Sequence, residues 1–384
     1  MAFDFAAPPD RRGGDSTKWN RYQGRDVLPM WVADMDFRAP PAVLAALHRR
    51  VDHGVFGYGG PSPSLQDTVR QHLQAEYGWA VEPQWIVWLP GLVAGLNVAC
   101  RAIGEDGDNV FTAIPVYPPF LGAPEHSRRR LCSAPLVRTQ ERWQWDFGAV
   151  DTMLTERRPR LWLFCHPHNP VGRAWDEEEL ERIADLALRH DLVIASDEIH
   201  CGLVLDPARR HRPLASLAPE IARRTITLMA PSKTFNIPGL YCSFAIISDP
   251  DLRRRFQHAM AGIMPHVNTL GLVACEAALR DGGEWHAALL DHLRGNARRV
   301  HEIIRTLPGL AMTPVEATYL AWIDCAGLAT ANPQRFFEQA GVGLSAGGDF
   351  GPGGERFVRL NFGCSRVLLE EALARMSHAV SEAQ

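Results

Sequence analysis

Short apolar runs recur through the middle of the chain from about residue 85. Six of them contain five or six residues, are rich in β-branched and aromatic types, and cover residues 85–89, 109–114, 161–165, 192–196, 225–229 and 243–247. Runs of this length and composition are typical of buried strands. Because helix-like segments separate them, the pattern predicts an α/β domain with a mostly parallel sheet that helices cover on both faces.

The best-defined helix signal lies between the third and fourth apolar runs. Asp176 stands before it and Glu179 follows three residues later, which is the arrangement of a capping box. Apolar residues then recur at helical spacing, at Leu180, Ile183, Leu186 and Ala187. A further helix is expected over 41–51.

The pattern changes after about residue 280. A helix is predicted over 286–306, and short strands are predicted around 319–324 and 357–362, as in a smaller α+β domain. A chain of 384 residues is also longer than one core usually organises. We place the boundary on the helical stretch 269–306. We therefore expect an N-terminal segment that packs with or bridges to the small domain, a large domain, and a small C-terminal domain, over residues 1–40, 41–280 and 281–384.

Composition and charge narrow the classes of function. The formal net charge is -4, so no overall basic field favours nucleic acid or an anionic membrane. The longest apolar segment, 85–100, contains Pro90 and is too short to span a bilayer, and the first residues do not form a signal peptide. Eight cysteines occur singly without a CxxC pair, so no metal site and no disulfide framework are expected. We expect a cytoplasmic protein.

Lysine is scarce in this chain. Of the 40 basic residues of the Lys+Arg class, only Lys18 and Lys233 are lysines. A mutational bias toward arginine can remove lysine wherever charge alone matters. It cannot replace a lysine whose amine must become neutral and attack a carbonyl, because guanidinium does not deprotonate. Lysine chemistry in this protein therefore has two candidate residues.

Four chemically distinct side chains follow four of the predicted strands. Tyr117 comes after 109–114, Asn169 after 161–165, Asp197 after 192–196 and Lys233 after 225–229. Ligands of open α/β sheets bind beyond the carboxyl ends of the strands, which predicts that these residues share one rim. Each residue alone is more often part of a turn. Their joint placement favours a functional site.

The same four groups are those that pyridoxal phosphate (PLP) requires. The lysine amine forms a Schiff base with the cofactor, and a carboxylate beside the pyridine nitrogen keeps that nitrogen protonated. An amide donates to the ring oxygen, and an aromatic side chain stacks on the ring. The sequence therefore predicts a PLP enzyme with Lys233 as the catalytic residue.

A phosphate site is available after the first apolar run. Gly91 opens a predicted helix whose first free N–H groups, near Leu92 and Val93, can hold an anion, and Ser232 can add a hydroxyl. Taken without the other residues, Gly91 is better explained as an ordinary strand-to-helix turn.

Arg359 lies in the predicted strand 357–362. Strand alternation places it on one face with Phe357 and Asn361. A buried guanidinium needs a carboxylate and binds one through two hydrogen bonds. From the residues alone, two explanations of Arg359 are about equally good. It binds the carboxylate of a substrate, or it forms a structural ion pair or lies on an exposed face.

Seven segments in order along the chain resemble one family of PLP enzymes. The most specific are LPMWVADMDF (28–37) and the tetrapeptide DEIH (197–200); the others include HGVFGYG (53–59), HPHNPVGRAW (166–175), SKTFNIPGL (232–240) and FVRLNFGC (357–364). The chain resembles fold-type I enzymes of the class I/II aminotransferase superfamily. It is most similar to the MalY/PatB-type C–S β-lyases, whose members resemble cystathionine β-lyase.

This resemblance implies a role for each candidate residue. Lys233 would carry the Schiff base, Asp197 would face the pyridine nitrogen, Asn169 the ring oxygen, and Arg359 the substrate carboxylate. Tyr117 would stack on the ring, and His200 would also belong to the cofactor site. The backbone near Val32 and Ala33 would line the substrate side, and Tyr58 would reach the phosphate of the neighbouring subunit of a homodimer with shared sites.

The implied reaction is β-elimination of cystathionine or another S-substituted L-cysteine to pyruvate, ammonia and a thiol. An aminotransferase acting on an amino acid uses the same residues, and a regulatory PLP-binding protein is a third possibility. The chain departs from the family pattern in four places. The stretch after Tyr58 reads GGPSPS, His166 stands where Asn is frequent, Gly202 where Asp is frequent, and Tyr241 where aminotransferases often place a phosphate-binding Arg.

Overall fold

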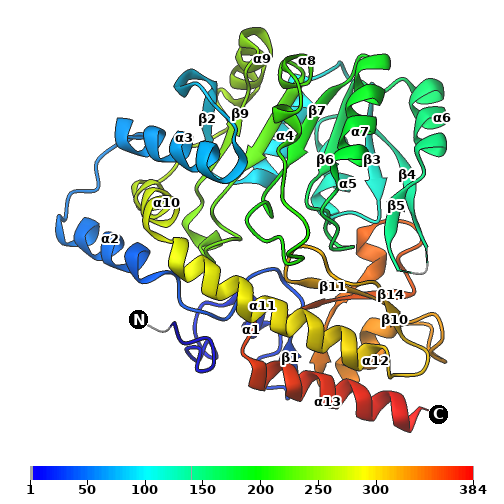
Figure 1. Ribbon diagram of the computed structural model, residues 1–384. Helices are drawn as coiled ribbons and strands as arrows, with labels where there is room; N and C mark the ends of the chain where they lie inside the picture. The colour runs from blue at the N-terminus through cyan, green and yellow to red at the C-terminus, as the bar shows by residue number, and fades with distance from the viewer. Residues whose placement is uncertain (1–2, 140, 384) are drawn as a thin grey trace.

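An eight-stranded sheet lies in the upper half of the molecule as viewed in Figure 1. In the computed structural model, which describes residues 3–139 and 141–383, the strand order is β2-β9-β8-β7-β6-β3-β4-β5. Neighbours from β8 to β4 are parallel, whereas β9 and β5 run against their neighbours. The strands span Ile86–Leu89 (β2), Asn109–Ile114 (β3), Arg130–Arg138 (β4), Trp143–Trp145 (β5), Leu161–Cys165 (β6), Val193–Asp197 (β7), Thr225–Met229 (β8) and Ser243–Ile246 (β9).

All six strands predicted from apolar runs are present, with bounds that agree within one residue. The strands β4 and β5 were not predicted. Residues 130–138 alternate between buried and exposed positions at the side of the sheet, so they lack a continuous apolar run. The predicted mostly parallel sheet is confirmed, and β9 adds an antiparallel strand inside it.

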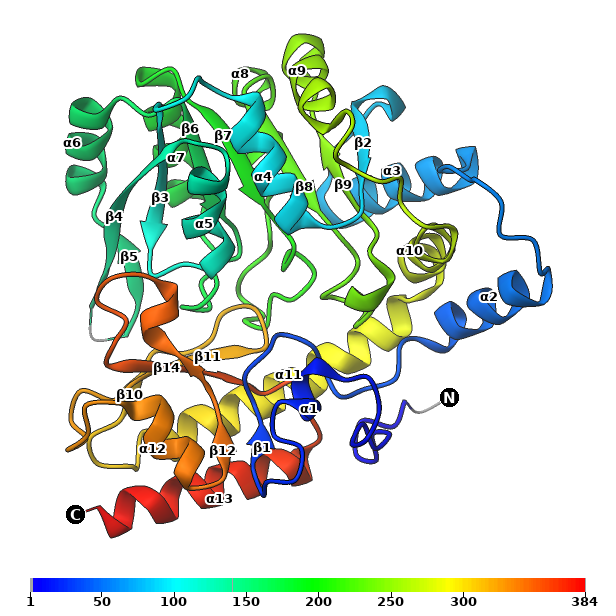
Figure 2. The same ribbon diagram turned by 180° about the vertical axis from the view of Figure 1, so that it is seen from behind.

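Helices cover both faces of this sheet, as Figures 1 and 2 show from opposite sides. One face packs against α4 (Leu92–Ala102), α5 (Pro118–His126) and α9 (Pro250–Met260). The other packs against α6 (Phe147–Arg157), α7 (Glu177–Arg189) and α8 (Pro219–Ala222). The predicted capping box begins α7, because Asp176 accepts from the Glu179 N–H over 3.1 Å and Glu179 accepts from the Asp176 N–H over 2.9 Å.

A four-stranded antiparallel sheet lies below the first one (Figure 1). Its order is β10-β11-β14-β13, with bounds Ala311–Met312, Leu320–Asp324, Phe357–Asn361 and Ser345–Ala346. The helices α11 (Gly283–Ile304) and α13 (Arg366–Glu382) lie side by side and share its core. The helix α12 (Pro333–Gln339) completes this half.

The N-terminal segment pairs with the C-terminal half. The strand β1 (Leu28–Pro29) runs parallel to β12 (Val342–Gly343). The remaining helices are α1 (Thr17–Asn20), α2 (Pro41–Asp52), α3 (Pro63–Tyr77) and α10 (Thr269–Asp281), with short 3-10 turns at 83–85, 214–216, 238–240 and 347–350. The helical stretch 269–306 is two helices that meet at Gly282, where a side chain would collide with the Phe235 ring.

We propose for the folded chain the same division into 1–40, 41–280 and 281–384. No helix within residues 3–139 and 141–383 is long and apolar enough to cross a membrane. Within the same ranges, no cluster of three or more His, Cys, Asp or Glu side chains is arranged to hold a metal ion.

Candidate active site

The four predicted rim residues lie at the ends of strands that point the same way. Asp197 is the last residue of β7, and Tyr117, Asn169 and Lys233 lie in the loops that follow β3, β6 and β8. The Tyr117 N–H donates to the Asn169 carbonyl over 3.0 Å, so the first two of these loops touch. The rim faces the smaller sheet, because Asn169 also contacts Arg359 of β14.

Arg359 is buried, with 4% of its surface exposed. Its Nη1 donates to Asn169 Oδ1 over 3.0 Å, and its Nη2 donates to the Trp31 carbonyl over 2.9 Å. Its Nε has no partner, and no carboxylate of the described residues lies within 4.0 Å. Burial lowers the pKa of Arg359 to about 10, so the group remains a cation at neutral pH. A buried cation without a counter-ion can receive the carboxylate of a ligand.

Lys233 reaches across to the N-terminal segment, where its Nζ donates to the Ala33 carbonyl. Burial lowers the pKa of Lys233 to about 8, with Arg359 also lowering it and Asp34 and Asp197 opposing the shift. The amine is therefore neutral in a substantial fraction of molecules near physiological pH. A neutral amine is the form that attacks a carbonyl or takes a proton.

Asp197 is buried without a cation bonded to it. Its Oδ1 accepts from the Ile199 N–H over 3.1 Å, and burial raises the pKa of Asp197 to about 7, which the nearby Glu198 charge increases further. A positively charged ring nitrogen placed beside this carboxylate would favour its ionised form. The site therefore offers a carboxylate suited to a protonated heterocycle.

The predicted phosphate site begins at Gly91, which is the residue before the first turn of α4. The N–H groups of Leu92 and Val93 stand in that first turn, where they have no partner within the helix. The Tyr241 ring lies near, since a Cβ on Gly91 would approach its Cδ1 to 3.9 Å. Ser232 is half-buried in the turn before Lys233.

Two residues of the C-terminal half had no role in the sequence analysis, namely Tyr319, which precedes β11, and Asn361 of β14. The Tyr319 hydroxyl donates to the Ala33 carbonyl over 2.9 Å, and Asn361 Nδ2 donates to the Val32 carbonyl over 2.6 Å. Strand alternation in β14 places Asn361 on the same face as Arg359, so the sequence could have indicated Asn361 as a site residue. No pattern in the sequence indicated Tyr319. These bonds hold the backbone at Val32 and Ala33 beside Lys233.

The two remaining predicted site residues differ in where they lie relative to this group. His200 is buried beneath Tyr319, with ring centroids 6.2 Å apart, and burial lowers the pKa of His200 to about 3. Tyr58 is fully exposed in the loop between α2 and α3. A single chain therefore does not bring Tyr58 into the site.

The second lysine of the chain, Lys18, belongs to a buried ion pair. Lys18 is fully buried, and its Nζ lies 2.7 Å from Asp36 Oδ2. Arg11 pairs with the same carboxylate over 2.8 Å. Lys18 is thus occupied by an ion pair, whereas Lys233 bonds to a backbone carbonyl, so Lys233 is the better candidate nucleophile.

Comparisons with known proteins cover nearly the whole chain. The family model for aminotransferase class I and II matches residues 25–376. PatB of Bacillus subtilis (strain 168), a cystathionine beta-lyase, is 39% identical over 98% of this chain and 100% of its own length. The crystal structure of OvoB is 46% identical with a TM-score of 0.96, and covers 100% of both chains. Cystalysin from Treponema denticola, which contains a pyridoxal 5'-phosphate cofactor, is 33% identical with a TM-score of 0.96 over 100% of both chains.

Proposed function

Because the chain belongs to the class I and II aminotransferase family, we propose that it is a PLP-dependent C–S β-lyase. Its substrate is cystathionine or another S-substituted L-cysteine, and its products are pyruvate, ammonia and a thiol. The likeness to PatB over the full length of both chains supports this choice within the family.

The residues at the rim fit the cofactor. Three suitable groups are present. Lys233 is a buried amine bonded to a backbone carbonyl, and Asp197 is a buried carboxylate that pairs with no cation of the described residues. Asn169 is an amide whose oxygen already accepts from Arg359. Lys233 would bind the aldehyde carbon, Asp197 the pyridine nitrogen, Asn169 the ring oxygen through its NH2 group, and Tyr117 the ring face. Gly91, Leu92, Val93 and Ser232 would hold the phosphate, and His200 would support the same site.

The unpaired guanidinium of Arg359 is the observation that carries the proposal. A buried cation costs several kcal/mol of free energy unless a charge partner compensates it. The α-carboxylate of an amino acid supplies such a partner and would bind Nε and an Nη together. Arg359 of β14 would then orient the bound substrate. The backbone at Val32 and Ala33 would lie alongside the substrate.

The mechanism follows from what these side chains do around the cofactor. PLP, when bound, withdraws electrons from the substrate Cα and so stabilises negative charge there. Lys233, released as a neutral amine when the substrate amine takes its place, would remove the Cα proton. Asp197 keeps the ring nitrogen protonated, and Arg359 holds the substrate so that the Cα–H bond faces the amine. The thiolate then leaves from Cβ.

We further propose a homodimer in the cytoplasm with shared sites. Tyr58 is fully exposed, and Val55 and Phe56 of the same loop are exposed as well. Apolar side chains in such a loop favour burial against a second copy. In that copy Tyr58 would reach the phosphate group, where Tyr241 stands near Gly91.

The test is an assay of purified holoenzyme with S-substituted cysteines and no added 2-oxo acid. We expect pyruvate, ammonia and free thiol over many turnovers. Aminotransferase chemistry, which the family description also covers, predicts that turnover stops after one equivalent and resumes when a 2-oxo acid is supplied. That result would identify the protein as an aminotransferase and would contradict the proposed lyase activity.

A further inference from the structure

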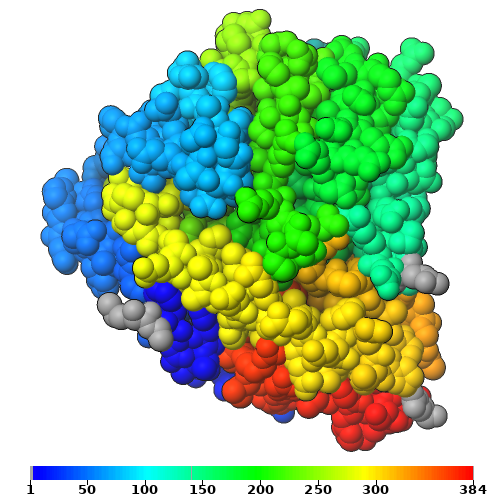
Figure 3. Space-filling view, viewed as in Figure 1, coloured from blue at the N-terminus to red at the C-terminus, as the bar shows by residue number. Residues whose placement is uncertain are grey.

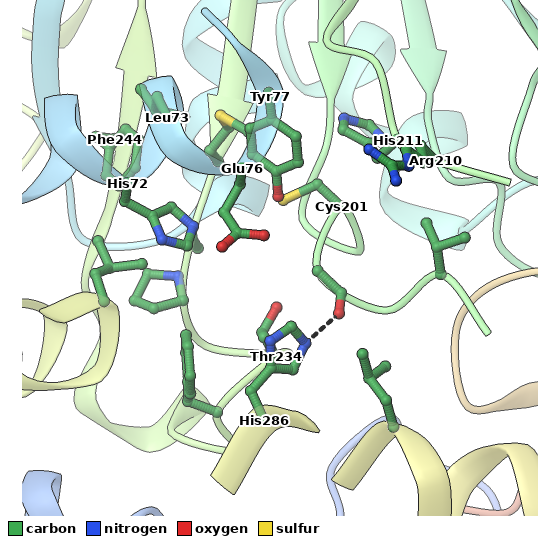
Figure 4. A pocket seen from close by; sticks show the side chains of 18 of the residues that line it. His72, Leu73, Glu76, Tyr77, Cys201, Arg210, His211, Thr234, Phe244 and His286 are labelled. Carbon is green, nitrogen blue, oxygen red and sulfur yellow. Dashed lines mark hydrogen bonds between the residues drawn. The ribbon is translucent and has the colours of Figure 1, made fainter. Parts of the chain in front are cut away.

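A second cavity lies behind the turn that carries Lys233 and is separate from the rim described above. Its volume is about 260 Å³. It opens on the face shown in Figure 3, between α3, α11 and the loop that follows β7. Figure 4 shows its lining side chains from close by.

Consecutive residues of one turn face different spaces. Lys233 bonds to the Ala33 carbonyl, whereas Thr234 lines the cavity. Thr234 is 5% exposed and lines the cavity. Figure 4 shows its hydroxyl directed into the cavity. A hydroxyl that faces a cavity can donate a hydrogen bond to a ligand or accept one from it.

The cavity is kept open at this point by Gly202. A Cβ there would come within 2.6 Å of Thr234 Oγ1. The Gly202 carbonyl accepts a hydrogen bond from His286 Nε2 over 2.5 Å. This bond joins the loop that follows β7 to α11 at the cavity wall. This position is one of those at which the chain departs from the family pattern.

Two charged side chains of opposite sign line the cavity without an ion pair among the described residues. Glu76 of α3 directs its carboxylate into the space, and Arg210 lies on the opposite side beside His211 (Figure 4). The neighbouring Arg209 is different, because it pairs with Glu316 over 3.3 Å and with Asp206 over 3.5 Å. Among the described residues that line the cavity, Glu76 and Arg210 thus offer a carboxylate and a guanidinium that make no ion pair, and both are accessible to solvent.

The remaining lining is suited to an apolar body. Aliphatic and aromatic side chains form an apolar wall of the cavity from several elements, chiefly Leu73, Met229, Phe244, Leu279 and Leu290. His72 stands beside Glu76, and burial lowers the pKa of His72, which favours the neutral imidazole at physiological pH. A neutral imidazole can accept a hydrogen bond from an ammonium group.

We propose that this cavity binds an apolar α-amino acid at a site distinct from the active site. The ammonium group would bind Glu76, the carboxylate would bind Arg210, and the side chain would lie on the apolar wall. The Thr234 hydroxyl would complete the polar contacts. The occupant would thus touch the turn next to Lys233, although the site itself does not depend on the lyase reaction.

The experiment measures binding of L-leucine by calorimetry to holoenzyme reduced with borohydride, in which the Lys233 amine is blocked. L-Leucine has no leaving group at Cβ. We expect saturable binding with one site per chain. We expect 3-methylbutylamine, which lacks the carboxylate, and 4-methylpentanoate, which lacks the ammonium group, to bind at least about tenfold more weakly, the scale of one charged contact.

Glu76→Gln and Arg210→Met should each weaken L-leucine binding by about tenfold or more, because each removes one charge partner. The matched controls Glu82→Gln and Arg223→Met alter exposed residues outside the cavity and should bind as the parent does. The proposal is overturned if L-leucine does not bind, if both charge variants bind as tightly as the controls, or if the two analogues bind as tightly as L-leucine. Absence of cofactor after reduction would count against the proposed function alone, since the same titration would still test the cavity.

Discussion

Arg359 and Asn169 are joined by a hydrogen bond of 3.0 Å between Nη1 and Oδ1, although 190 residues separate them. The bond connects β14 of the smaller sheet to the loop after β6 of the larger one. It fixes the orientation of the amide, whose NH2 group is then free to donate to a ligand. It also leaves Arg359 Nε free for a carboxylate.

Arg359→Lys should lower kcat/KM strongly. The ammonium group cannot make the two parallel hydrogen bonds of a guanidinium, and breaking a buried charged contact corresponds to roughly 2–4 kcal/mol. Steady-state kinetics with an S-substituted cysteine measure the loss. Arg299→Lys, which changes a partly exposed arginine paired with Glu370, is the control. An unchanged kcat/KM would assign Arg359 to structure.

Asp197→Asn should bind the cofactor and lose nearly all turnover. The neutral amide cannot stabilise a protonated ring nitrogen, so negative charge at the substrate Cα is no longer stabilised. Cofactor absorbance and the initial rate of pyruvate release are the two measurements. Rates close to those of the parent would make Asp197 a turn residue without a catalytic role.

Borohydride reduction of the yellow holoenzyme should attach the cofactor to Lys233 only. The two lysines of the chain differ in environment, because Lys18 is fully buried against Asp36 and Lys233 is not paired with a carboxylate. Peptide mapping by mass spectrometry locates the label. A label on Lys18, or none, contradicts the assignment of a PLP enzyme.

Attachment of PLP to the apoenzyme should accelerate with pH and level off above about pH 8. Burial lowers the pKa of Lys233 to about 8, so the reactive neutral amine increases as pH rises through that value and is protonated below it. Stopped-flow absorbance from pH 6 to 10 gives the profile. A free alkylamine should show its midpoint near pH 10. The same midpoint for the enzyme would mean that the site does not depress the lysine pKa.

Two inactive variants should restore activity when their subunits mix. Lys233→Ala lacks the amine, and a severely impaired Tyr58→Ala lacks the residue proposed to enter the partner's site. Each heterodimer would contain one intact site, so random exchange restores up to about a quarter of parental activity. Native mass spectrometry verifies exchange. Heterodimers without activity would show that the site is not shared.

The sequence alone determined six of the eight strands of the larger sheet and the residues at its rim. Continuous apolar runs identify strands buried on both faces, and parallel strands place their following loops at one edge, so Tyr117, Asn169, Asp197 and Lys233 could be grouped before any contact was known. The capping box at Asp176 is equally local, since both partners lie within four residues. These features depend on interactions between near neighbours.

The tertiary structure decided which distant residues meet. No periodicity relates Arg359 to Asn169, Tyr319 to Ala33, or Thr234 to the cavity that Gly202 leaves open. It also showed Lys18 in an ion pair, which the scarcity of lysine had left open. Hydrophobic patterning reports only whether a side chain is buried. The partner of a buried polar group depends on how two sheets and their loops pack, which is a property of the whole chain.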